Sequence, residues 1–229
     1  MDNILKVKSI SIWIFIVPFF AINLCLILIT QFHDLFPNKE DILHNTIPYF
    51  DGGTSISRTA RVYPTYLIFK PAMFLTSYLL VKYWLNNKKI ILNYDKNIKH
   101  VKKFIFFGIS SAILLTIHSI FLGIKFDYDL YKLFRRIVML LFIVFEIIAQ
   151  VYLVLSLYKI KGLILNKINI LFLRFKLILV SALIIIAIIS IPIIGNPGNK
   201  FLKHALEWDY FVGVISFYLL TYFMWKKNN

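Results

Sequence analysis

The apolar run ISIWIFIVPFFAINLCLILIT, residues 10–30, decides the fold class of this chain. It has about the length that spans the hydrocarbon core of a bilayer, and it contains no charged side chain. It is too long for the apolar core of a cleavable signal peptide, and no small-residue cleavage site follows it. We therefore expect a retained membrane helix, preceded by Lys6 and Lys8 and kinked at Pro18, where proline removes a backbone hydrogen bond.

Further apolar blocks follow, and they account for an unusual composition. Hydrophobic residues make up 59% of the chain and the mean hydropathy is +0.75, whereas soluble domains are usually about 45–50% apolar. The 229 residues fit one bundle of such helices. The sequence predicts a single all-α domain, an integral membrane bundle of six transmembrane helices at about residues 10–30, 64–85, 104–124, 137–158, 177–194 and 208–225, with a long outer loop at 31–63.

The charged residues predict how this bundle is oriented. The net charge of +15 comes from lysines and arginines at the ends of the apolar blocks, where they mark topology, so nucleic acid is not an expected partner. The N-terminus, the connections 86–103 and 159–176 and the C-terminus together carry more of these cations than the opposite connections do. The positive-inside rule therefore places both termini in the cytoplasm and the 31–63 loop outside or in a lumen.

Two other features of the composition bear on structure. Tryptophans lie at block ends, at Trp13, Trp84, Trp208 and Trp225, as interfacial tryptophans do. Cys25 is the only cysteine, so neither an intramolecular disulfide nor a cysteine metal cluster is possible. The connection 159–176 is apolar at several positions. It is predicted either to lie in the interface as an amphipathic segment or to extend the fourth and fifth helices.

The polar, turn-prone passage from Pro48 to Phe69 carries a family resemblance. Its residues Ile56, Ser57, Thr59, Pro64, Ile68 and Phe69 match the first-loop signature of the Frag1/DRAM/Sfk1 family, which includes the N-terminal region of CWH43-like proteins. The pair Glu207-Trp208 at the start of the last predicted helix is similar to the family's Glu-Trp there. The resemblance covers the whole chain when the six helices and the long first loop are included.

The resemblance implies a multi-pass protein of lipid-rich membranes, with membrane lipids as partners and no cofactor. Related members are linked with lipid remodelling of GPI anchors, with phosphoinositide and lipid-asymmetry control, and with autophagy. This chain departs from the pattern, because Arg58 replaces the family's aspartate, Thr65 its glutamate and Tyr63 its first proline. A role of those acidic groups therefore cannot be transferred, and the family supplies no agreed catalytic residues.

Glu146 is the candidate functional group inside the membrane. It lies near the middle of the fourth predicted helix, where an ionisable side chain is costly and usually faces the bundle interior. Gln150 is four residues further on and shares its helix face. One interpretation is a buried site for a lipid head group, a proton or a cation. The other is an interhelical hydrogen bond made by a protonated Glu146.

A second group of polar residues is predicted on the outer side. His118 lies in the outer half of the third predicted helix, and His204, Glu207 and Asp209 lie at the outer end of the sixth. With acids and histidines of the loop they could form a zinc-type hydrolase site. However, no tight metal-binding spacing such as H-E-x-x-H is present, and no metal site is predicted. The simpler interpretation is a set of interfacial polar residues and a helix cap.

Arg58 and Arg61 add positive charge to the outer loop, with Lys70 beside them. Arginine forks bind phosphate well, so a lipid phosphate at the outer interface is one interpretation. Alternatively, the two arginines pair with an acid, namely Asp51, Glu207 or Asp209, and hold the loop to the bundle. In both cases we expect them to pack toward the Glu207-Trp208 end of the last helix.

These observations favour a non-catalytic, accessory or regulatory role in membrane lipid organisation. One alternative is an enzyme that remodels lipids at the outer interface with the outer histidines and acids. A second alternative is a transporter of a small solute or a lipid, gated around Glu146.

Overall fold

The computed structural model describes residues 3–124, 128–195 and 197–226, and this part of the chain is all-α, as predicted. Most of it lies in long helices. These are α1 (Asn3–Gln31), α4 (Tyr66–Tyr94), α5 (His100–Phe121), α6 (Asp129–Lys159), α7 (Ile170–Gly195) and α8 (Lys200–Met224). Short helices lie in the connections: η1 (His33–Leu35), η2 (Lys39–Asp41), α2 (Pro48–Asp51), α3 (Ile56–Ala60), η3 (Lys161–Ile164) and η4 (Pro197–Asn199).

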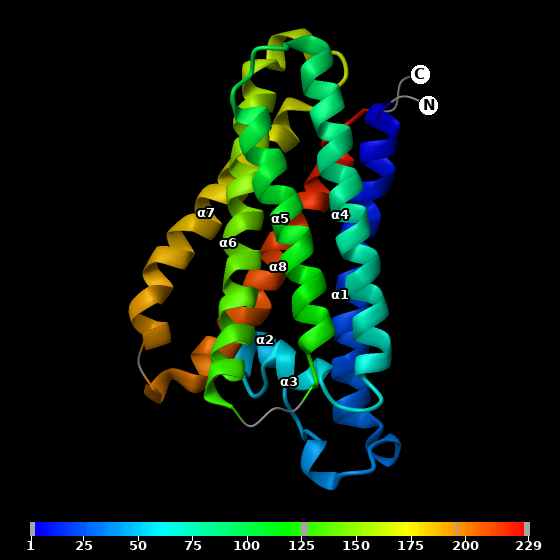
Figure 1. Ribbon diagram of the computed structural model, residues 1–229, viewed down its shortest axis with the longest axis vertical. Helices are drawn as coiled ribbons and strands as arrows, with labels where there is room; N and C mark the ends of the chain where they lie inside the picture. The colour runs from blue at the N-terminus through cyan, green and yellow to red at the C-terminus, as the bar shows by residue number, and fades with distance from the viewer. Residues whose placement is uncertain (1–2, 125–127, 196, 227–229) are drawn as a thin grey trace.

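The long helices pack side by side along the long axis of the molecule (Figure 1). Neighbours in the bundle follow the order α1, α4, α5, α6, α7 and α8, and α8 closes the circle by packing against α1. Helix α7 diverges from the bundle toward its C-terminal end (Figure 1), and its side chains there, such as Ile188, Ile189 and Ile191, are exposed.

Four of the described helices are long and apolar enough to cross a membrane: Asn3–Gln31, His100–Phe121, Asp129–Lys159 and Ile170–Pro192. Their outward faces carry large apolar side chains, such as Phe20 on α1 and Phe106 on α5, which are 64% and 62% exposed. Such faces fit a lipid environment and not water. The protein is therefore an integral membrane protein with several apolar helices.

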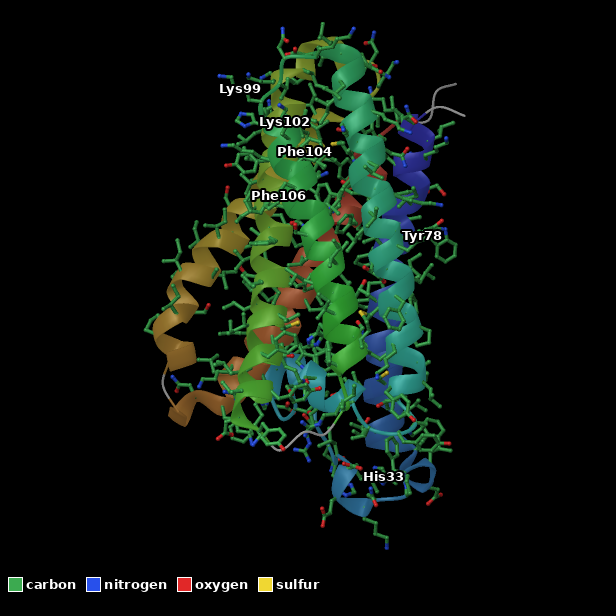
Figure 2. All side chains as sticks on the ribbon, in the orientation of Figure 1. His33, Tyr78, Lys99, Lys102, Phe104 and Phe106 are labelled. Carbon is green, nitrogen blue, oxygen red and sulfur yellow. The ribbon has the colours of Figure 1, made fainter. Side chains whose placement is uncertain are left out.

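The connections alternate between the two ends of the bundle (Figure 1). The chain termini, the α4–α5 connection and the α6–α7 connection lie at one end, and the loop of residues 32–65 lies at the other. Figure 2 shows Lys99 and Lys102 at the first end and His33 at the second. The lysine-rich connections and the long loop are thus at opposite ends of the molecule, whatever its orientation in the membrane.

Several helices extend beyond the residue ranges that the apolar blocks of the sequence predicted for them. Helix α4 begins after Pro64, contains Pro71, and continues through Lys88 and Lys89 to Tyr94. Helix α6 begins at Asp129 and not near residue 137, so Arg135 is helical. Helix α7 begins at Ile170, so residues 170–176 of the 159–176 connection extend a helix, while the rest of the connection contains the short helix η3. Hydropathy locates the apolar part of a helix, whereas the backbone remains helical into the polar region on either side.

Three of the four tryptophans are not interfacial anchors. Trp84, Trp208 and Trp225 are fully buried in the protein, and Trp13 alone is exposed, at 52%. Trp84 packs over Gly108 of α5, where an added Cβ atom would lie 2.5 Å from the indole ring. The close approach of α4 and α5 therefore requires glycine at this position. These three tryptophans lie at the ends of apolar blocks, as predicted, but they pack inside the protein and do not face the membrane interface.

Candidate functional site

The 32–65 loop contains a tight turn organised by Asp51. Its carboxylate accepts hydrogen bonds from the Thr46 hydroxyl (2.8 Å) and from the backbone N–H groups of Ile47 and Gly53 (both 2.7 Å). Burial alone would raise the pKa of Asp51, but these three hydrogen bonds lower it below its usual value. Asp51 is therefore ionised and structural.

Gly52 places this turn directly against α8. Its φ angle of +60° lies in the left-handed region, and an added Cβ atom would lie 1.8 Å from the carbonyl oxygen of Phe201. A side chain at this position is excluded by both effects. The carbonyl oxygen of Gly52 is 3.0 Å from Nδ1 of His204, which donates to it in the corresponding tautomer.

Two further α8 residues hold the loop. Trp208 donates its indole N–H to the carbonyl oxygen of Thr54 (2.9 Å), and its ring meets that of Tyr49 edge-on at 5.0 Å. The carboxyl group of Glu207 accepts hydrogen bonds from the backbone N–H groups of Ile56 and Ser57 at the start of α3. The Glu207-Trp208 pair thus holds the loop to the bundle.

The residues that carry the family resemblance have mainly structural positions. The Ser55 hydroxyl caps α3 by accepting from the backbone N–H of Arg58 (3.1 Å), and Thr59 is buried and donates to the carbonyl oxygen of Ser55 (3.0 Å). Ile56 and Phe69 are buried in the core, and the Tyr63-Pro64 peptide bond is cis. Their burial and hydrogen bonds give the apolar and hydroxyl residues of this pattern a structural role.

The two loop arginines do not form the ion pairs considered above. In the described residues the ion pair found joins Lys132 and Asp129 of α6, and none involves Arg58 or Arg61. Arg58 is half-buried and close enough to His204 to affect it electrostatically. The polar contacts that fix the loop to α8 come from His204, Glu207 and Trp208 instead.

Positive charge gathers where the loop faces the start of α6. Partial burial lowers the pKa of Arg61, and the charges of Arg135 and Arg58 lower it further, while Asp41 acts in the opposite direction. Arg135 donates from Nη2 to the Ser57 hydroxyl (3.2 Å), and its guanidinium lies over the Tyr131 ring. The sequence did not identify Arg135, because it is far from the loop along the chain.

His204 belongs to the same electrostatic environment. Burial lowers its pKa, the hydrogen bond with Gly52 raises it, and the positive charges of Lys200, Arg58 and Lys203 lower it again. The result is a pKa below the ordinary value for histidine. A neutral imidazole is favoured here.

A cavity of about 1050 Å³ lies between the loop, α5, α6 and α8. We call it the outer chamber. Its wall carries the charged side chains Arg61, Lys132, Arg135, Arg136, Asp41 and Glu207, with His118 and His204 beside them. Along α6 the wall becomes apolar, at Met139, Leu140 and Ile143. The chamber therefore has a largely cationic part near the loop and an apolar part along the bundle.

A smaller cavity of about 100 Å³, the inner chamber, lies deeper among α1, α4, α5, α6 and α8. Both chambers are bordered by Ser57, His118, Met139, Ile143 and Glu207, so they adjoin each other. The wall of the inner chamber is almost entirely apolar, and Glu146 is among its polar residues.

Glu146 is buried, at 1% exposure, in a network that joins three helices. Its carboxyl group accepts from the Ser111 hydroxyl of α5 (2.6 Å), from the Tyr218 hydroxyl of α8, and from the Gln150 amide (3.2 Å). The same Gln150 amide also donates to the carbonyl oxygen of Val214 (3.3 Å). These contacts fit the interpretation of Glu146 as a residue that makes hydrogen bonds between helices. The inner chamber also provides a cavity beside Glu146, which the interpretation as a buried binding site requires.

Lys176 is a buried ionisable residue that sequence reasoning assigned to a basic connection. It is fully buried in α7, donates to the Thr221 hydroxyl (2.7 Å), and lies 3.8 Å from the centre of the Phe217 ring. Helical spacing could have revealed it. Leu173, Lys176, Val180 and Leu183 lie on one face at intervals of three and four residues, and all four are buried.

The predicted outer residues do not form a metal centre. In the part of the chain that the structure describes, no group of three or more His, Cys, Asp or Glu side chains could hold a metal ion. Asp209 is exposed on α8, and His204 and Glu207 contact the loop backbone. His118 is separate from them in the sequence but borders the outer chamber with both.

No family model, no curated protein and no solved structure matches this chain.

Proposed function

We propose that this chain is a six-helix membrane protein with an accessory, non-catalytic role in membrane lipid organisation, as its resemblance to Frag1/DRAM/Sfk1 proteins implies. In this proposal α4 and α8 join the four strongly apolar helices as membrane spans. They have 29 and 25 residues, and about 20 residues suffice to cross a bilayer. The loop of residues 32–65 lies outside and both termini are cytoplasmic, because the lysine-rich connections lie at the end of the termini.

The observation that carries the proposal is the pair of adjoining chambers beneath the docked loop. A cationic region continues into an apolar wall inside a bundle of membrane helices, which is the division of chemistry found in a lipid molecule. The side chains of the outer group that would serve an enzyme, His204 and Glu207, are occupied by backbone contacts with the loop.

A deletion strain tests this role. We expect its lipids to keep their overall composition, measured by mass spectrometry, while their distribution between leaflets changes, measured with a membrane-impermeant reagent for amino head groups. The wild-type gene restores the distribution, and so does Gly162→Ala, because an added Cβ atom there meets nothing within 4 Å. Gly52→Val, which prevents the loop from docking, does not restore it.

Two results would replace the proposal with an alternative. A changed acyl composition, repaired only when His204 and Glu207 are intact, would indicate a lipid-remodelling enzyme. Uptake of a solute that depends on a proton gradient and is lost in Glu146→Gln would indicate a transporter.

A further inference from the structure

We propose that the outer chamber binds the phosphate group of an amphiphile, whose alkyl chain leaves along the apolar wall of α6. This inference rests on the proposed membrane role and specifies its ligand class. It is carried by three features of the chamber: cations without ion pairs in the described residues, a buried imidazole nitrogen without a hydrogen-bond partner there, and an apolar exit.

The cations of the chamber have few counter-charges. Arg61, Arg135 and Arg136 line it, and in the described residues none of them forms an ion pair. Arg135 uses Nη2 on the Ser57 hydroxyl, but its Nε is buried with no hydrogen-bond partner there. A guanidinium fork with an unused donor is suited to phosphate, which accepts several charge-assisted hydrogen bonds.

The arginines also repel one another. The positive charge of Arg135 lowers the pKa of Arg61, and the negative charge of Asp41 offsets this only in part. An anion between Arg61 and Arg135 would remove this repulsion and supply acceptors to both groups. The arrangement is therefore more stable with an anion than without one.

His118 provides a second, independent sign of a ligand. Its side chain is 7% exposed, it borders both chambers, and its Nδ1 atom has no hydrogen-bond partner in the described residues. A buried polar atom left unpaired is costly, and in native structures it usually has a ligand, a water molecule or a functional reason. At this junction the imidazole can donate to an anionic or ester oxygen in the outer chamber.

The apolar side of the chamber points to an amphiphile and not to a free anion. Met139, Leu140 and Ile143 follow the charged residues along α6, and Leu140 is 60% exposed on the apolar helix. The inner chamber, at about 100 Å³, has room for roughly three water molecules and cannot hold a long chain. The chain is therefore expected to pass over the α6 wall toward the surrounding lipid.

The test measures binding of hexadecyl phosphate to the purified full-length protein in a non-ionic detergent, with hexadecanol and inorganic phosphate as separate probes. We expect hexadecyl phosphate to bind saturably and at least tenfold more tightly than either of the other two. Arg135→Ala and Arg61→Ala should each weaken it about tenfold or more, because each removes charge-assisted hydrogen bonds. Arg135→Lys should recover part of the affinity, since it restores charge without the fork.

The matched control is Arg174→Ala, which removes an exposed arginine on α7 away from the chamber and should leave affinity unchanged. A thermal unfolding curve for each variant separates lost binding from lost folding. His118→Phe keeps a large ring but removes the donor, and it should also weaken binding of hexadecyl phosphate.

Each remaining outcome overturns a defined part of the proposal. Equal affinity for inorganic phosphate would assign the chamber to a free anion and refute the alkyl-chain exit. Equal affinity for hexadecanol, or no effect of Arg61→Ala and Arg135→Ala in folded protein, would refute the phosphate site. Binding is measured in detergent, so its failure is distinguishable from failure of the role in lipid organisation, which is read in a deletion strain.

Discussion

Trp208 donates its indole N–H to the carbonyl oxygen of Thr54 at 2.9 Å, across 154 positions of the chain. This contact is one of those that join α8 to the first long loop, and the indole is fully buried. It fixes one wall of the outer chamber, because Ser55 and Ser57 follow Thr54 and line the cavity. The candidate site therefore depends on how the loop docks on α8.

Trp208→Phe should loosen the loop without removing the aromatic ring. The carbonyl oxygen of Thr54 would lose its donor, and a buried group left unsatisfied costs about 1–3 kcal/mol. We expect faster cleavage within residues 32–65 in limited proteolysis and a lower unfolding temperature in detergent. Trp13→Phe, at the exposed tryptophan, is the control and should behave as wild type. Identical cleavage of both variants would contradict the prediction.

Gly52→Ala should have a larger effect on the same loop. The new Cβ atom would meet the Phe201 carbonyl at 1.8 Å, and the residue would have to adopt a φ angle of +60°. Left-handed backbone at a non-glycine residue alone costs about 1–3 kcal/mol, and the clash adds to it. Proteolysis of the loop should therefore exceed that of Trp208→Phe. Gly162→Ala serves as control, and a Gly52→Ala protein with a protected loop would show that docking is not as described.

Protonation of His204, which precedes the proposed span at 208–225, should weaken loop docking as pH falls below about 6.5. Glu207 acts in the opposite direction, because burial raises its pKa in the docked protein from 4.5 to about 7. The pKa of His204 in the docked protein lies below its ordinary value of 6.5. As pH falls, His204 therefore binds a proton in the undocked state first. Its contribution to the free energy of docking is fully present above about pH 6.5 and is lost as pH falls through the lower pKa of the docked state. The positive charges of Lys200, Arg58 and Lys203 oppose protonation in the docked state.

His204→Asn isolates this effect, because the amide can still donate to the Gly52 carbonyl but does not titrate. As pH falls from 7 to 5, the loop of wild type should lose more protection from proteolysis, or gain less, than the loop of this variant. Groups common to both proteins, Glu207 and Asp51 among them, cancel in the difference. Equal pH profiles would exclude His204 as the titrating group.

Glu146→Leu should destabilise the bundle more than Glu146→Gln. The leucine removes the acceptor of the Ser111, Gln150 and Tyr218 donors. The bonds from Ser111 and Tyr218 join different helices, and such bonds are worth about 0.6 kcal/mol each on average. A loss of about 1 kcal/mol is expected for leucine and less for glutamine, which retains one acceptor. Unfolding in mixed detergent measures this, with Ser111→Ala as the variant that removes one donor alone. Equal stability of both Glu146 variants would refute a structural network.

The proposed topology can be checked with single cysteines in a Cys25→Ser background. Asn38→Cys lies in the loop and Lys96→Cys lies in the α4–α5 connection, and both positions are exposed. A membrane-impermeant maleimide added to intact cells should label the first and not the second. Labelling of Lys96→Cys alone would reverse the orientation, and labelling of both would contradict the proposed spans.

The sequence determined those parts of the protein that depend on local composition. Apolar blocks such as 10–30 predict membrane helices because the backbone must satisfy its hydrogen bonds within the helix in lipid. The polar passage around Asp51-Gly52-Gly53 predicts a turn, because glycine adopts conformations that other residues avoid. The sequence also shows that Glu146, Glu207 and Trp208 lie in predicted helices, where their polar groups need hydrogen-bond partners. It does not identify those partners.

Only the tertiary structure decided which distant groups meet. Arg135, His118 and Arg61 come from α6, α5 and the loop, and they line one cavity because those three elements pack together. No spacing in the sequence encodes that convergence. The burial of Lys176 and of three tryptophans was likewise decided by neighbouring helices, since hydropathy describes a residue and its flanks but not what packs against it.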